Sequence, residues 1–100
     1  MRNFQTGTLL ALSLSLLLTG NATAQPMPPR QIVEVGNGVY AATGYASNNM
    51  GFIVTSEGVV VIDTGMTPGI GQQFLADIRK QTDQPIRYVI FTHYHYDHVD

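Results

Sequence analysis

The segment Tyr88–His98 has the sequence YVIFTHYHYDH, an apolar run followed at once by a cluster of polar side chains. The apolar part is short, β-branched and aromatic and carries no charge, so it predicts a buried strand. All the histidines of the chain, His93, His95 and His98, lie in this segment together with Asp97. They follow the strand directly, and in open α/β sheets functional sites collect where strands end.

These side chains are candidate metal ligands. Imidazole nitrogen and carboxylate oxygen suit zinc, and the same donors accommodate iron or manganese. Because an extended backbone repeats its facing every second residue, we expect His93, His95 and Asp97 to share one side of the chain. A turn after Asp97 would bring His98 to the same cavity. A histidine tract that binds metal loosely is the alternative, but the alternation with tyrosines behind a strand favours a built site.

A second apolar run, Val59–Ile62, is followed by Asp63. The run lacks polar alternation, so both of its faces should be covered. After it, Thr67-Pro68 predicts the start of a helix, with a capping hydroxyl before a proline in the first helical position. Strand, helix and strand together predict a βαβ crossover whose two strands end at the same edge of the sheet. Asp63 should therefore lie close to the histidines, either as a turn residue or as an acceptor for a ligand imidazole N–H.

The helix should bury one apolar face. Its apolar residues Ile70, Phe74, Leu75 and Ile78 recur at helical spacing, and Asp77 is expected among the polar residues around them. This pattern is typical of a structural stripe and does not indicate a cofactor site.

The other strands are predicted from β-branched runs between turn residues. We expect them at residues 32–35, 39–43, 50–55 and 86–91. Asn37-Gly38 predicts a hairpin between the first two, because both residues tolerate positive φ. Asn48 and Asn49 belong to a polar loop, where they either form a turn or line the site from a neighbouring edge.

The pattern Thr-His-Tyr-His-Tyr-Asp-His at residues 92–98 resembles the T-H-x-H-x-D-H signature of the metallo-β-lactamase superfamily. The segment Val59–Gly65, with the sequence VVVIDTG, is similar to the strand-Asp-x-Gly element of that family. The resemblance covers about residues 31–100 and implies an α/β fold, the N-terminal half of an αββα sandwich. It also favours the imidazole-acceptor role for Asp63.

The resemblance implies specific roles for the polar cluster. In the family, the residues that match His93 and His95 hold a first metal ion, and those that match Asp97 and His98 hold a second. Asp97 would also orient the attacking water or accept its proton. The chain is thus expected to derive from a zinc-dependent hydrolase, with two ions in the complete protein and no organic cofactor. The family's later ligands do not occur before Asp100, so we expect an N-terminal fragment that is inactive by itself.

The substrate is expected to be a small molecule, a β-lactam or another compound with an ester-like or amide-like bond. A sulfatase-like or quinoprotein-associated periplasmic metallohydrolase is an alternative, and so is a secreted fragment that binds metal without catalysis. The chain has no cysteine, which disfavours the β-lactamase subclass that uses Asp and then Cys at its second metal.

Residues 1–24 are typical of a secretory signal peptide. Arg2 precedes an apolar core at Leu9–Leu18, and Ala22-Thr23-Ala24 forms a small-x-small cleavage site. Cleavage would leave Gln25 as the first residue of the mature chain, which would then comprise a proline-rich linker at residues 25–30 and a domain at residues 31–100. An uncleaved membrane anchor is the alternative, but the apolar run is short for a bilayer. We therefore expect a periplasmic or secreted protein without a stable anchor.

Composition narrows the classes of partner. The formal net charge is −2 and no basic patch is present, which argues against a nucleic-acid surface. Without cysteine there is no disulfide framework and no thiolate metal site. Nothing in the sequence indicates an oligomeric state.

Overall fold

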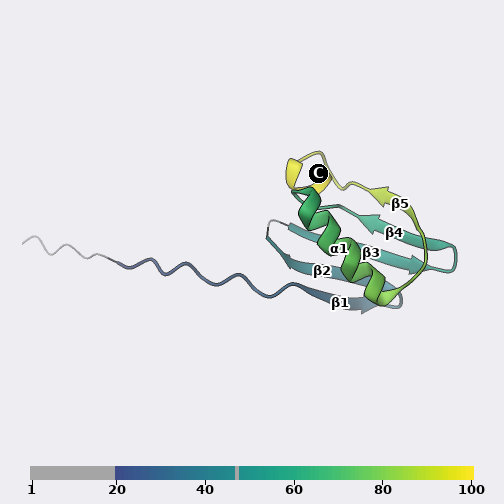
Figure 1. Ribbon diagram of the computed structural model, residues 1–100, viewed down its shortest axis with the longest axis horizontal. Coiled ribbons are helices and arrows are strands. Elements are labelled where there is room, and N and C mark those ends of the chain that lie inside the picture. Colours follow the sequence, from purple (N-terminus) through teal and green to yellow (C-terminus); the bar gives the residue numbers. More distant parts are fainter. Residues whose placement is uncertain (1–19, 47) are drawn as a thin grey trace, which may run out of the picture.

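The computed structural model describes residues 20–46 and 48–100. Its elements in chain order are β1 (Gln31–Gly36), β2 (Val39–Tyr45), β3 (Asn48–Thr55), β4 (Gly58–Ile62), α1 (Pro68–Gln81), β5 (Ile86–Ile90) and α2 (Tyr96–Val99). The strands form one sheet in the order β1-β2-β3-β4-β5 (Figure 1). Neighbours from β1 to β4 pair antiparallel, whereas β4 and β5 pair parallel. This mixed sheet confirms the predicted α/β class and the βαβ unit β4-α1-β5.

The hairpin between β1 and β2 turns at the predicted Asn37-Gly38 pair. Gly38 has a φ of +71°, and a Cβ there would lie 2.8 Å from the carbonyl oxygen of Val54. Glycine is therefore required twice at this position, for its backbone conformation and for the close approach of β3.

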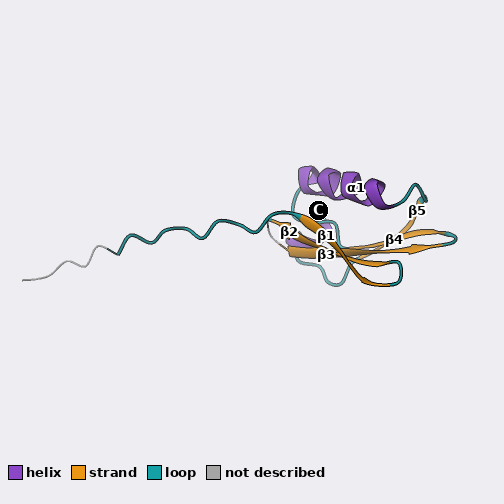
Figure 2. Ribbon diagram, turned by 90° about the horizontal axis from the view of Figure 1, so that it is seen from below, coloured by secondary structure: helices purple, strands orange, loops and turns teal. Residues whose placement is uncertain are grey.

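Helix α1 begins as the sequence predicts. The Thr67 hydroxyl accepts the backbone N–H of Ile70 at 3.2 Å, and Pro68 occupies the first helical position. The helix crosses one face of the sheet, and the opposite face carries no comparable helix among the described residues (Figure 2). The core between helix and sheet contains Ala42, Tyr45, Met50, Phe52, Val59, Val61, Phe74 and Ile78.

Two predictions for α1 are wrong. Leu75 is 42% exposed, and Asp77 is only 6% exposed. The stripe that faces the sheet runs through Ile70, Phe74, Asp77 and Ile78, which follows the spacing i, i+4, i+7, i+8 of a helical face. Leu75 lies one residue, about 100° of helical rotation, away from that stripe.

The prediction that Tyr88–Phe91 is a buried strand is also wrong. Strand β5 ends at Ile90, and Tyr88 is 68% exposed. The reason is topological, because β5 is an edge strand that pairs only with β4 in the described part of the chain. The prediction that both faces of β4 are covered is likewise right for one face only. Val59 and Val61 are buried beneath α1, whereas Val60 on the other face is half-buried.

Residues 20–30 precede the sheet as an exposed extended tail (Figure 1). The predicted signal-peptide core at Leu9–Leu18 lies outside the described residues, and the predicted cleavage site at residues 22–24 lies in the tail. No helix in residues 20–46 and 48–100 combines the length and the hydropathy needed to cross a bilayer. The last part of the tail contacts the domain, since a Cβ at Gly44 would lie 2.5 Å from the Pro29 carbonyl oxygen.

Candidate metal centre

The polar cluster lies at the edge of the sheet where the parallel strands β4 and β5 both end. Ile62 pairs with Ile90, and the backbone N–H of Asp63 donates to the carbonyl of Ile90 at 3.0 Å. Beyond Ile90 the backbone is irregular up to residue 95, and helix α2 follows at this edge (Figure 1). The expected alternation along an extended chain therefore fails, because Asp97 already lies in α2. The turn that carries His98 begins before Asp97 and not after it.

Helix α2 is held against the loop that follows β4. The backbone N–H of Thr64 donates to the carbonyl of His98 at 3.0 Å, and the Thr64 hydroxyl donates to the carbonyl of Asp100 at 2.8 Å. In return, the N–H of Asp100 donates to the carbonyl of Gly65 at 3.3 Å. The position of His98 is thus fixed by backbone contacts as well as by its side chain.

Asp63 is the buried carboxylate beneath this cluster, with 3% of its surface exposed. Its Oδ1 accepts the backbone N–H of Thr92 at 2.8 Å, and its Oδ2 accepts the Thr92 hydroxyl at 2.8 Å. The same Oδ2 lies 2.8 Å from Nδ1 of His98. Burial raises the pKa of the Asp63 carboxyl, but the hydrogen bonds from Thr92 and His98 outweigh burial and hold the pKa below its usual value. The side chain is therefore an anion at neutral pH.

The ring of His93 contacts the other two imidazole rings. The centroid of the His93 ring lies 4.0 Å from that of His98 and 4.7 Å from that of His95. Nδ1 of His93 lies 2.9 Å from the Thr92 hydroxyl, and Nε2 of His98 lies 3.5 Å from a carboxylate oxygen of Asp97. The sequence analysis assigned no role to Thr92, although the signature places a hydroxyl residue directly before the first histidine.

Asn48 also reaches the cluster, at the start of β3. Its Nδ2 lies 3.4 Å from Nδ1 of His98. Of the two roles that the sequence left open for Asn48, the structure places it beside the histidines.

The donor atoms have the chemistry that zinc requires, but they do not converge on one point. Among residues 20–46 and 48–100, no group of three or more His, Asp and Glu side chains is arranged to hold a metal ion together. The rings of His93 and His98 suit a metal ion in another respect, because Nδ1 of each lies at hydrogen-bond distance from a neighbour and Nε2 is the other ring nitrogen that can bind metal. The described residues thus offer candidate ligands for part of a metal site.

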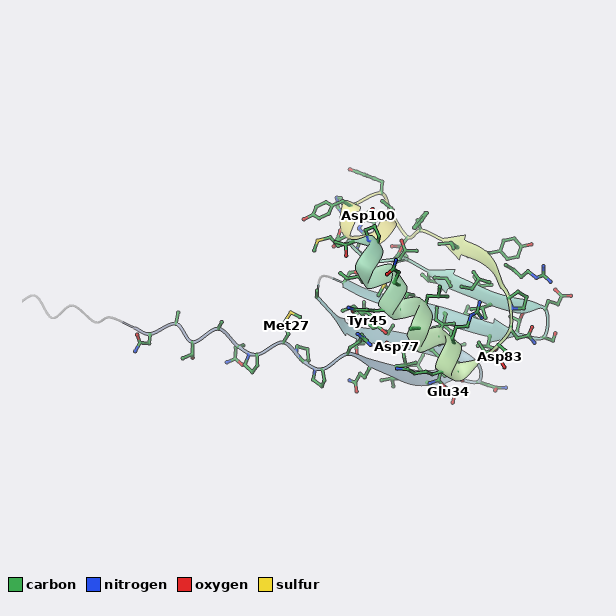
Figure 3. All side chains as sticks on the ribbon, in the orientation of Figure 1. Met27, Glu34, Tyr45, Asp77, Asp83 and Asp100 are labelled. Carbon is green, nitrogen blue, oxygen red and sulfur yellow. The ribbon has the colours of Figure 1, made fainter. Side chains whose placement is uncertain are left out.

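A second buried carboxylate, Asp77, belongs to α1 and lies beside Tyr45 (Figure 3). Its carboxylate accepts hydrogen bonds from Nε of Arg30 at 2.7 Å, from Nζ of Lys80 at 2.8 Å and from the hydroxyl of Tyr45. Burial raises the pKa of Asp77, but these donors outweigh it and lower the pKa to about 2. Burial and the neighbouring carboxylate raise the pKa of the Tyr45 hydroxyl.

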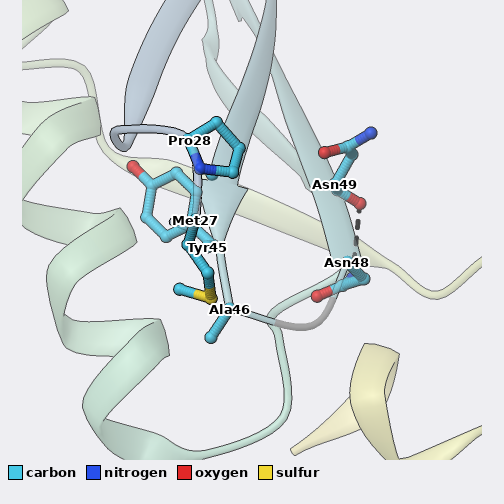
Figure 4. Close-up of a pocket in the computed structure, with 7 residues that line it drawn as sticks. Met27, Pro28, Tyr45, Ala46, Asn48 and Asn49 are labelled. Atoms are coloured by element: carbon cyan, nitrogen blue, oxygen red, sulfur yellow. Dashed lines mark hydrogen bonds between the residues drawn. The ribbon is translucent and has the colours of Figure 1, made fainter. Parts of the chain in front are cut away.

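A pocket of about 300 Å³ opens beside Tyr45, between the tail and the connection from β2 to β3 (Figure 4). Its lining residues include Met27, Pro28, Ala46 and Asn48. A larger hollow of about 710 Å³ lies around Glu57 and Arg87 at the opposite ends of β4 and β5, remote from the histidines.

Comparison with curated proteins finds a relative in Pseudomonas sp. (strain ATCC 19151), a linear primary-alkylsulfatase. The two sequences are 38% identical over 48 residues, which cover 48% of this chain and 9% of the relative. The chain therefore spans only about a tenth of the length of that protein.

Comparison with solved structures finds a double mutant of the sec-alkyl sulfatase PisA1, with a TM-score of 0.64 and 30% identity over 69% of this chain and 11% of the other. The metallo-beta-lactamase DIM-1 matches with a TM-score of 0.59 and 20% identity over 71% of this chain and 35% of the other. The metallo-beta-lactamase FIM-1 from Pseudomonas aeruginosa, in its mono-zinc form, matches with a TM-score of 0.59 and 24% identity over 75% and 37%. The two β-lactamases show the fold alone.

The chain thus covers between 11% and 37% of the length of these solved structures. The family model of the metallo-beta-lactamase superfamily matches residues 43–99, which include Asp63, Thr92 and all three histidines. The chain belongs to the metallo-beta-lactamase superfamily.

Proposed function

We propose that this chain is part of an exported, metal-dependent hydrolase that cleaves sulfate esters. The observation that carries the proposal is the contact between the buried carboxylate of Asp63 and Nδ1 of His98, at 2.8 Å, in a ring cluster with His93. A carboxylate behind a histidine is the arrangement that orients a metal ligand. Membership of the superfamily supports the same assignment.

His93 and His95 are proposed to hold a first zinc ion, and Asp97 and His98 a second. Zinc, when bound, supplies a Lewis acid and lowers the pKa of water to about 7. The chain's own residues then have separate tasks. Asp63 holds the ring of His98 in one orientation, and Asp97 orients the attacking water and accepts its proton at a carboxylate oxygen.

The substrate class rests on the relatives. The curated relative with 38% identity and the solved structure with 30% identity are both named as alkyl sulfatases. The β-lactamases match at 24% identity or less, which carries no argument about substrate. We therefore place sulfate esters of alkyl alcohols ahead of β-lactams, the first expectation from the sequence.

The test uses the full-length gene product, stripped of metal and reconstituted with zinc. It is assayed on a primary alkyl sulfate, a secondary alkyl sulfate, a chromogenic β-lactam and a thioester. Zinc-dependent release of sulfate should exceed turnover of the other substrates, and His95→Ala should lower it by at least about a thousandfold. The matched control is Tyr94→Phe, because Tyr94 is an exposed neighbour of His95 and should leave the rate unchanged.

Faster turnover of the β-lactam than of either sulfate ester would overturn the substrate class. Full activity without metal, or in His95→Ala, would overturn the metal-dependent mechanism.

Export is the second part of the proposal. The tail that contains Ala22-Thr23-Ala24 is exposed and has no helix or strand, so it is accessible to a peptidase. N-terminal sequencing of exported protein should begin at Gln25. A mature protein that still contains residues 9–18 would show a retained anchor instead.

A further inference from the structure

The hydroxyl of Thr92 lies between the carboxylate of Asp63 and the ring of His93. Its Oγ1 is 2.8 Å from Oδ2 of Asp63 and 2.9 Å from Nδ1 of His93. A hydroxyl has one proton to donate and two lone pairs that accept, whereas an ionised carboxylate only accepts. The hydroxyl proton must therefore point at Asp63. The contact with His93 is then a hydrogen bond only if Nδ1 of His93 carries a proton and donates it.

His98 contacts the carboxylate of Asp63 directly, and the same hydrogen-bond argument determines its tautomer. Nδ1 of His98 lies 2.8 Å from the same Oδ2 of Asp63, so this nitrogen must also carry a proton. The amide nitrogen of Asn48 is a more distant neighbour of Nδ1, at 3.4 Å, and the shorter contact to a charged acceptor determines the tautomer.

We infer that Thr92 is a positioning residue whose hydroxyl links the carboxylate of Asp63 to the ring of His93 by hydrogen bonds. One buried carboxylate thereby fixes the Nδ1–H tautomer of both His93 and His98 and leaves Nε2 of each ring as the nitrogen that binds metal. This inference rests on the proposed function in assigning the two rings to different ions. Asp63 then orients one ligand of each ion, directly for His98 and through Thr92 for His93.

The surroundings of Thr92 support a role through hydrogen bonding. Thr92 is exposed, so its hydroxyl contributes little to the core. Its backbone N–H donates to Oδ1 of Asp63 at 2.8 Å, which holds the residue over the carboxylate independently of the hydroxyl. Loss of the hydroxyl alone should therefore leave the backbone in place and release only the ring of His93.

The experiment measures the tautomers directly in the metal-free, full-length gene product with ¹⁵N-labelled histidine. Two-bond ¹H–¹⁵N spectra at about pH 8, where an ordinary imidazole is neutral, distinguish Nδ1–H from Nε2–H rings. In the unmodified protein, both His93 and His98 should be Nδ1–H. In Thr92→Val, which keeps the shape of the side chain, His93 should shift toward Nε2–H and His98 should not change.

Zinc affinity supplies the second measurement. By chelator competition, Thr92→Val should weaken the binding step assigned to His93 by about tenfold and leave the other step unchanged. Thr92→Ser retains the hydroxyl and should restore both the tautomer and the affinity. The matched control is Thr64→Val, because the Thr64 hydroxyl donates to the backbone carbonyls of Asp100 and His98 and touches neither ring. It should leave the tautomer of His93 unchanged.

An Nε2–H ring at His93 in the unmodified protein would overturn the inference without any variant. So would equal losses in Thr92→Ser and Thr92→Val, or the same change in Thr64→Val, because either would indicate a general loosening of the segment. The tautomers do not depend on the substrate. A protein with the expected tautomers that fails to hydrolyse sulfate esters would refute the proposed substrate and leave the role of Thr92 intact.

Discussion

The domain contains two buried carboxylates of nearly equal exposure, Asp63 at 3% and Asp77 at 6%. Both have pKa values below the ordinary value because hydrogen-bond donors outweigh the effect of burial. They differ in their partners. Asp77 is surrounded by the cations of Arg30 and Lys80 and by the hydroxyl of Tyr45, whereas the only charged or titratable partner of Asp63 among its hydrogen-bond contacts in the described residues is a histidine.

Under the proposed function, this difference separates a structural carboxylate from one that supports a metal site. The donors around Asp77 serve to neutralise it, and they tie the tail, β2 and α1 together. The ring that contacts Asp63 keeps a second nitrogen for another partner. Burial and pKa alone would not distinguish the two residues. What distinguishes them is that the histidine beside Asp63 has a second ring nitrogen that can bind another group.

The largest effect on stability is expected from a substitution of Asp77. Asp77→Asn leaves two cations without their acceptor, and we expect the free energy of unfolding to fall by about 2–3 kcal/mol. Zinc affinity should not change. Urea unfolding and chelator competition on the full-length protein measure the two quantities. A loss of zinc affinity equal to that of a variant at Asp63 would show that the two clusters do not act separately.

The reverse pattern is expected at Asp63. Asp63→Asn should weaken zinc binding by about ten- to a hundredfold without changing the number of ions bound at saturation. Asparagine suits the site sterically, because residue 63 has a φ of 59°, a conformation in which Asn and Asp are the favoured residues with a side chain. The metal-free protein should therefore lose only about 1 kcal/mol of stability. Unchanged zinc affinity would make Asp63 a turn residue.

The pH dependence of stability provides a separate test of the role of Asp77. The pKa of Asp77 is lowered to about 2, against an ordinary value of about 3.9. The carboxylate therefore contributes stability that is complete above about pH 4 and is lost as the pH falls toward 2. Because Lys80 is well exposed, we expect about 1–2 kcal/mol rather than the full value of the shift. Asp63 contributes with the same sign, so the quantity to measure is the difference between the unmodified protein and Asp77→Asn across this range. An unchanged slope in Asp77→Asn would contradict the assignment.

Local signals in the sequence predicted the features that depend on few neighbours. Asn37-Gly38 forms its hairpin and Thr67-Pro68 starts its helix, because turn and capping chemistry act within four residues. The βαβ order predicted that Asp63 would approach the histidines, and the distance to His98 is 2.8 Å. Strand order could not be predicted in the same way, and the exposure of β5 follows from its place at the edge.

The burial of Asp77 and the contacts of Thr92 also escaped prediction. Asp77 appears polar on a helical wheel, and its burial depends on Arg30 and Tyr45 from distant segments. Thr92 acts through a proton whose direction depends on Asp63, 29 residues earlier. Pairings across such separations leave no periodic trace in a single sequence. The metal roles of His93 and His95 are predictions that the experiments above must test.

The smallest effect in the comparison is expected from Tyr45→Phe. The ring packs edge-on against Phe74 at a centroid distance of 5.7 Å, and this contact survives the substitution. Only the hydroxyl that donates to Asp77 is lost, so we expect a loss of about 1 kcal/mol. Arg30 and Lys80 still neutralise the carboxylate. Tyr88→Phe is the matched control, because Tyr88 is exposed on the edge strand and its substitution should change stability by less than about 0.5 kcal/mol. If Tyr45→Phe cost as much as Asp77→Asn, the hydroxyl and not the cations would be the main partner of Asp77. The contrast drawn with Asp63, whose partners are a hydroxyl, a backbone N–H and an imidazole, would then lose its physical basis.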